Sequence, residues 1–155
     1  MIFLDIDGVL VPEKKFAETK NKFLTAEDYL KFDADCLLNF ENILRRYPDV
    51  LVVISSSWRE VVKIEVLKNL FSSDIGNRIL GFTPFIDVRF LDNCEYIRYQ
   101  EVLEFLKQNN AVNIPWVAID DLSYHYPSDI NIVVTDAYCG FNETAALALD
   151  SYLQE

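Results

Sequence analysis

The chain contains no long hydrophobic run. Its longest purely apolar stretches, 50–54 and 145–149, are short within a sequence of 155 residues. A membrane-spanning helix needs about 20 consecutive apolar residues, and a secretory signal peptide has a basic start before its apolar core. The sequence has neither pattern, so we expect neither a signal peptide nor a membrane span.

Cysteine and positive charge are also scarce. Cys36, Cys94 and Cys139 are odd in number, far apart and without the paired spacing of a metal site, so we expect reduced thiols and a cytoplasmic location. Lys and Arg total 14 against 25 Asp and Glu, which gives a formal net charge of −11. General binding to duplex nucleic acid depends on positive charge and is therefore not expected. A local basic site remains compatible with this charge.

What the chain has in quantity is apolar material: 51% of its residues are hydrophobic and 14% are aromatic. This content predicts one compact domain over residues 1–155. Strand-like runs are expected at 2–5, 50–55, 79–82, 116–120 and 132–135. Three- and four-residue apolar spacing predicts helices at 36–47 with Asp33 as N-cap, at 64–71, around 102–106 and from Asn142. This alternation predicts an α/β fold, a three-layer Rossmann-like parallel sheet with helices on both faces.

Polar clusters follow three of the predicted strands. Ligands of open α/β sheets bind beyond the carboxyl ends of the strands, so these clusters should converge on one edge. Two carboxylates about 4 Å apart repel by roughly 4 kcal/mol at an effective dielectric near 20, unless a cation or proton lies between them. Oxygen donors of this kind favour Mg²⁺. The clusters are Asp5 with Asp7, Ser55 with Ser56 and Ser57, and Asp120 with Asp121.

These residue types suit phosphoryl transfer. With a cation present, one carboxylate can attack phosphorus and form an aspartyl-phosphate, while a second one, two residues on, exchanges protons. Gly8 lets the backbone turn and expose amides to phosphate oxygens, and a serine hydroxyl can bind the same oxygens. Arg59 either adds positive charge there or pairs with a surface carboxylate. Arg98, at the start of a predicted helix, is the favoured cation for the transferred group, and Lys63 is its competitor.

The motifs resemble those of the haloacid dehalogenase-like (HAD) phosphohydrolases. The matching stretches are DIDGV at the first strand, LVVISS at the second and IDD at a later one. FLDIDGVL, FDADCLLNF, VVISSSWR and AIDD are most similar to the HAD domains of Swiss Army knife RNA-repair proteins. The resemblance implies that Asp5 is the nucleophile and Asp7 the general acid/base. It also implies that Ser55 or Ser56 binds phosphate, with Ser56 preferred, and that Mg²⁺ is held by Asp5, Asp120, Asp121 and the Asp7 carbonyl.

The short interval between the first two motifs implies little or no cap domain. It includes a segment without clear periodicity, about 12–32, which we interpret as a flap over the site. Its lysines could attract an anionic substrate such as a nucleic-acid end: Lys14, Lys15, Lys20 and Lys22. We therefore expect a Mg²⁺-dependent phosphatase acting on a phosphorylated small molecule, a nucleotide or a polynucleotide end. The alternative is a non-hydrolytic phosphate- and metal-binding or regulatory module on the same fold.

Overall fold

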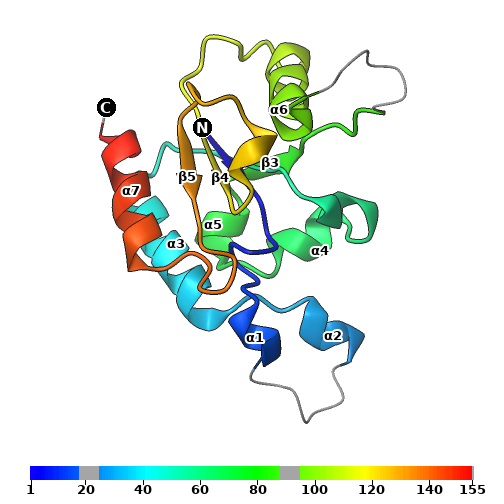
Figure 1. The fold of residues 1–155 in the computed structure, drawn as a ribbon, viewed down its shortest axis with the longest axis vertical. Helices are drawn as coiled ribbons and strands as arrows, with labels where there is room; N and C mark the ends of the chain where they lie inside the picture. The colour runs from blue at the N-terminus through cyan, green and yellow to red at the C-terminus, as the bar shows by residue number, and fades with distance from the viewer. Residues whose placement is uncertain (18–24, 88–94, 155) are drawn as a thin grey trace.

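The core of the protein is a five-stranded, all-parallel sheet (Figure 1). The computed structural model describes residues 1–17, 25–87 and 95–154. Each predicted strand run contains one observed strand, so the predicted α/β class is confirmed. The strands are β1 (Ile2–Leu4), β2 (Val52–Ile54), β3 (Ile79–Phe82), β4 (Val117–Asp120) and β5 (Ile132–Val134).

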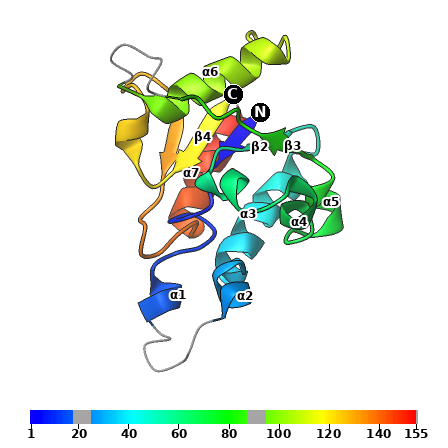
Figure 2. The same cartoon turned by 90° about the vertical axis from the view of Figure 1, so that its right-hand side faces the viewer.

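Both faces of the sheet are buried, which explains the continuous hydrophobic strands. Successive strand side chains point to opposite faces: Ile2 and Leu4 belong to one apolar cluster, whereas Phe3 belongs to the other. Figure 2 shows helices on both sides of the sheet. Helix α6 (Ile97–Gln108) covers the Phe3 face, and the opposite face is covered by α3 (Ala34–Arg46), α4 (Ile64–Lys68), α5 (Ser73–Gly76) and α7 (Glu143–Leu153).

The sheet reverses its winding direction beside β1. The strand order is β3-β2-β1-β4-β5, so the chain runs outward from β1 through β2 to β3 and then returns to place β4 on the other side of β1. In open α/β sheets the ligand crevice lies at the carboxyl ends of the strands where this reversal occurs. The fold therefore points to the ends of β1 and β4 as the functional edge.

Two of the predicted helix starts are confirmed by their caps. The Asp33 carboxylate accepts the Cys36 amide at 3.0 Å, and the Asn142 side chain accepts the Ala145 amide at 3.0 Å. Both caps satisfy amide groups that the first turn of a helix leaves without partners. None of the helices within the described ranges is long and apolar enough to cross a membrane.

The helix predicted over 64–71 is shorter than expected. Helix α4 ends at Lys68, and the Glu41 carboxylate then binds the Ser72 amide at 2.7 Å and the Ser72 hydroxyl at 2.6 Å. These contacts draw the chain out of the helical path. Lys63 is the exposed residue directly before this helix.

The segment 12–32 carries two short helices, α1 (Lys14–Ala17) and α2 (Ala26–Tyr29), which lie beyond one end of the sheet core (Figures 1 and 2). The Lys15 ammonium donates to the Asp28 carbonyl at 2.9 Å and to the Lys31 carbonyl. The Lys14 ammonium lies 4.0 Å from the carboxylate of Asp33, the residue directly after the segment. Lys20 and Lys22 lie outside the described residues. The parts of the chain described between β1 and β2 contain no cap domain.

Candidate active site

Three carboxylates converge at the carboxyl ends of β1 and β4. Asp5 follows β1, Asp120 is the last residue of β4, and Asp121 comes next. One oxygen of each lies within 4.8 Å of the others. Asp5 and Asp120 are buried and Asp121 is half-buried. The two acidic motifs therefore meet as predicted.

The cluster has the character of a cation site. Oδ1 of Asp120 accepts the Leu122 amide at 2.8 Å, whereas the buried Oδ2 has no hydrogen-bond partner among the described residues. A buried polar atom without a partner is costly, and a cation would satisfy it. Carboxylate oxygens are the donors that Mg²⁺ prefers, so the residues present fit this ion.

Burial controls the protonation of the cluster. The pKa of Asp5 is raised to about 8, first by burial and then by the charge of Asp120. The Ile6 amide at 2.8 Å, the charge of Arg98 and the Ser56 hydroxyl partly oppose this rise in pKa. The pKa of Asp121 is also raised, mainly by burial and secondly by Asp120. Without a cation the cluster therefore tends to retain a proton.

Gly8 lets the acidic strand ends approach each other. Its φ is +69°, and a Cβ atom there would lie 2.4 Å from Cγ of Asp121. The Gly8 carbonyl accepts the Thr135 hydroxyl at 2.9 Å. Its amide donates to the Val11 carbonyl at 3.0 Å. The prediction of a sharp turn is thus confirmed, but the Gly8 amide is used inside that turn and is not left exposed for phosphate.

Asp7 lies beside the cluster and not in it. Its side chain is exposed, and both carboxylate oxygens accept the Trp58 indole N–H, at 3.1 and 3.2 Å. Trp58 is buried in a short 3-10 helix, η1 (Ser57–Glu60), which follows β2. Sequence reasoning missed Trp58, although its position directly after the serine run was a usable signal.

The serines reach the same edge from β2. The Ser55 amide donates to the Leu4 carbonyl at 2.8 Å, which ties the end of β2 to β1. The Ser55 hydroxyl is buried and has no partner among the described residues. Ser56 caps η1, and its hydroxyl lowers the pKa of the Asp5 carboxyl. Both serines therefore remain candidates for binding phosphate.

Two arginines share one buried glutamate next to the cluster. Arg98, in the first turn of α6, donates to Glu101 at 3.3 Å, and its charge lowers the pKa of Asp5. Arg59 donates through both terminal nitrogens to Glu101 and at 3.0 Å to Thr83. Arg59 therefore pairs with a carboxylate, but with a buried one and not one on the surface; its role in binding phosphate stays a prediction. Of the two candidate cations, Arg98 lowers the pKa of Asp5 through its charge, whereas Lys63 is an exposed residue directly before α4. Sequence reasoning missed Glu101, whose position three residues after Arg98 was the available signal.

The loop after β4 adds a histidine and a tyrosine. Nδ1 of His125 lies 3.9 Å from Oδ2 of Asp120. Tyr126 is buried, and its pKa is raised well above the usual range by burial and by the charge of Asp120. Nδ1 of His125 and the Tyr126 hydroxyl have no hydrogen-bond partner within the described ranges. His125 and Tyr126 therefore add two polar groups beside Asp120.

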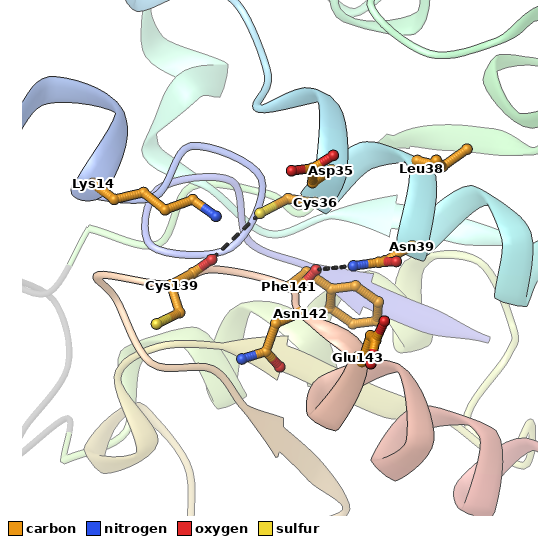
Figure 3. A pocket seen from close by; sticks show the side chains of 9 residues that line it. All are labelled: Lys14, Asp35, Cys36, Leu38, Asn39, Cys139, Phe141, Asn142 and Glu143. Carbon is orange, nitrogen blue, oxygen red and sulfur yellow. Dashed lines mark hydrogen bonds between the residues drawn. The ribbon is translucent and has the colours of Figure 1, made fainter. Parts of the chain in front are cut away.

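A separate pocket of about 330 Å³ lies between the start of α3 and the turn before α7 (Figure 3). Two of its polar groups are engaged: the Cys36 thiol donates to the Cys139 carbonyl at 3.5 Å, and the Asn39 amide donates to the Phe141 carbonyl at 3.3 Å. Burial is the main reason that the pKa of Cys36 is raised to about 12, which disfavours the reactive thiolate form. The carboxylates of the cluster do not line this pocket, and we do not place the chemistry there.

One comparison with known proteins gives a match. A family model described as "HAD domain in Swiss Army Knife RNA repair proteins" matches residues 1–146. No curated protein and no solved structure matches the chain. The matched range includes all five strands and every residue of the site described above. The family resemblance predicted from FLDIDGVL, VVISSSWR and AIDD is confirmed.

Proposed function

Since this chain belongs to the family of HAD domains found in Swiss Army Knife RNA repair proteins, we propose that it is a Mg²⁺-dependent phosphatase. It would hydrolyse phosphomonoesters through an aspartyl-phosphate on Asp5. The observation that carries this proposal is the approach of Asp5, Asp120 and Asp121 to within 4.8 Å. The Ser56 hydroxyl and the charge of Arg98, which both lower the pKa of Asp5, support the same function.

In the first half of the reaction, a carboxylate oxygen of Asp5 attacks phosphorus. The ester P–O bond breaks, and the leaving oxygen takes a proton from Asp7. Asp7 suits this role because Trp58 holds its carboxylate from one side while the side chain stays exposed to substrate. General acid catalysis requires such a positioned group.

In the second half, water attacks the phosphorus of the aspartyl-phosphate. Asp7 takes a proton from this water, inorganic phosphate leaves, and the Asp5 carboxylate is restored. Ser56 and Arg98 would bind the phosphoryl oxygens in both halves of the reaction, because both are close enough to the Asp5 carboxyl to lower its pKa. Fixed donors aimed at the transferred group stabilise its charge in the transition state.

Asp5, Asp120 and Asp121, with the Asp7 carbonyl, would hold the Mg²⁺ ion. When bound, this ion neutralises the clustered carboxylates and the phosphoryl charge. The structure supports this assignment through the unpartnered Oδ2 of Asp120. Burial and the charge of Asp120 raise the pKa of Asp5, which means that the cluster favours binding a positive charge, either a proton or a cation.

The proposed substrate class is a phosphorylated end, of a nucleotide or a polynucleotide. The family description names RNA repair, and the described part of the chain between β1 and β2 has no cap domain to enclose a small substrate. A phosphorylated small molecule is the alternative. A screen of end-phosphorylated oligonucleotides against phosphorylated metabolites, each with Mg²⁺, would decide between them.

The cysteines support a cytoplasmic location for this activity. Cys36 and Cys139 carry free thiols, as expected in a reducing compartment. Cys94 lies outside the described residues. We therefore propose that the protein acts in the cytoplasm.

The function is tested with an aryl phosphate, Mg²⁺ and the substitution Asp5→Asn. The variant should lose roughly a thousandfold or more in kcat, because removal of a nucleophile leaves little catalysis. Asp49→Asn, an exposed aspartate after α3, is the control and should keep full activity. A fully active Asp5→Asn protein would overturn the proposal. Stoichiometric phosphate uptake without turnover would favour the non-hydrolytic module.

A further inference from the structure

A small pocket adjoins the carboxylate cluster, and neither the proposed chemistry nor the family match assigns it a ligand. It has a volume of about 240 Å³, below the roughly 300–1,000 Å³ of typical drug-sized sites. It has room for one ring system. The residues that give it its character are Arg59, Phe85, Ile86, Ile97, Arg98 and His125.

Two of the pocket residues, Arg98 and His125, also lie next to the carboxylate cluster. Arg98 lines the pocket, and its positive charge lowers the pKa of Asp5. His125 lines the pocket and lies 3.9 Å from Oδ2 of Asp120. A group attached to a phosphoryl at Asp5 would therefore reach the pocket directly.

The walls of the pocket suit a flat aromatic group. The Arg59 guanidinium is held by Glu101 and lies 5.6 Å from the centre of the Phe85 ring, within the range of a cation–π contact. The Phe85 side chain is nevertheless 66% exposed, so much of its ring is open to a partner. Exposed phenylalanine beside a fixed guanidinium is a surface on which planar rings stack.

We propose that this pocket binds the leaving group of the substrate and selects esters whose alcohol carries a planar aromatic ring. The ring would stack on Phe85, with Ile86 and Ile97 as apolar neighbours. An aryl alcohol and a nucleoside both supply such a ring. The proposal rests on the proposed phosphatase function for its turnover tests, but ring binding itself does not require turnover.

The test compares Phe85→Ala with the wild type on three phosphate esters: an alkyl phosphate, 1-naphthyl phosphate and a nucleoside monophosphate. We expect KM for the two ring-bearing esters to rise about tenfold, equivalent to about 1.4 kcal/mol, with kcat/KM for the alkyl ester unchanged within about twofold. Tyr138→Ala removes another exposed aromatic, outside the pocket, and should change none of them. An effect on only one ring-bearing ester identifies the alcohol as aryl or nucleoside.

The pocket assignment is overturned if Phe85→Ala lowers kcat/KM equally for all three esters, or for none of them. If no ester turns over in any variant, the phosphatase proposal fails separately. Calorimetric binding of 1-naphthyl phosphate and of inorganic phosphate to Asp5→Asn, with and without Phe85→Ala, then decides the pocket. The assignment stands if Phe85→Ala weakens only the naphthyl ester, and it falls if both ligands or neither are affected.

Discussion

The indole N–H of Trp58 donates to both carboxylate oxygens of Asp7, at 3.1 and 3.2 Å. The two residues lie 51 positions apart, on the turn after β1 and on η1 after β2. The bond holds the Asp7 side chain, which stays outside the carboxylate cluster, in one direction. It therefore connects the serine strand end to the acid/base proposed for catalysis.

Replacing Trp58 with Phe should keep the aromatic packing and remove this bond. We expect kcat to fall about tenfold, with KM little changed. This loss is part of the roughly 10²- to 10⁴-fold rate enhancement that a positioned general acid/base contributes. Trp116→Phe is the matched control, because this second tryptophan packs on Phe3. Equal kinetics in the two variants would show that the indole N–H does not orient Asp7.

Gly8→Ala should disrupt the metal site. An added Cβ would lie 2.4 Å from Cγ of Asp121, and the φ of +69° also disfavours alanine. We expect Mg²⁺ affinity to fall about 10- to 100-fold, as is common when the support of a metal ligand is lost. Calorimetric titration with MgCl₂ measures this.

The control for that prediction is Gly81→Ala in β3. No heavy atom within 4 Å would meet its Cβ. It should leave Mg²⁺ affinity and melting temperature nearly unchanged. A wild-type Mg²⁺ affinity in Gly8→Ala would mean that Asp121 is not a ligand.

The stability gained from Mg²⁺ should grow with pH. The pKa of Asp5 is raised by burial and by Asp120 from 3.8 to about 8 in the metal-free fold. A carboxyl with a raised pKa contributes stability below its unfolded value, and that contribution is lost as pH rises through the folded value. The metal-free protein should therefore lose stability between about pH 4 and pH 8.

Above that range Mg²⁺ no longer competes with the proton on Asp5. At 100 times its Kd, it should then add about 2.7 kcal/mol, or roughly 5–10 °C in melting temperature. At pH 5 the shift should be smaller. Melting curves in EDTA and in MgCl₂ at pH 5 and 8.5 test this, with Asp5→Asn as control. Equal Mg²⁺ shifts at the two pH values would contradict it.

Glu101→Gln should weaken both the fold and the site. The Glu101 side chain is 2% exposed and pairs with Arg59 and Arg98, and losing one member of a buried pair costs about 3–5 kcal/mol. Urea unfolding measures the loss of stability. The kcat should fall as well, because Arg98 loses its anchor while it faces Asp5. Glu104→Gln, three residues after Glu101 on the same helix and bonded to Gln108, should change neither quantity.

Much of this architecture followed from local pattern. The strands were predictable because buried parallel strands are continuous and apolar, and the starts of α3 and α7 because Asp33 and Asn142 are strong N-cap residues. The approach of Asp5 to Asp120 followed from one rule: parallel strands end at the same edge of a sheet. None of these inferences needed the position of a distant side chain.

The hydrogen-bond and ion-pair partners of individual side chains could not be predicted in this way, because each partner depends on which distant segment packs beside the side chain. Trp58 binds Asp7 and Glu101 binds Arg59 only because the ends of β1, β2 and α6 meet in space. The Gly8 amide donates to the Val11 carbonyl because the turn brings these two residues together. The sequence by itself therefore determined the sheet, its functional edge and the acidic residues placed there. The tertiary structure decided how those residues are held, since hydrogen bonds and ion pairs are set by distances that no local pattern encodes.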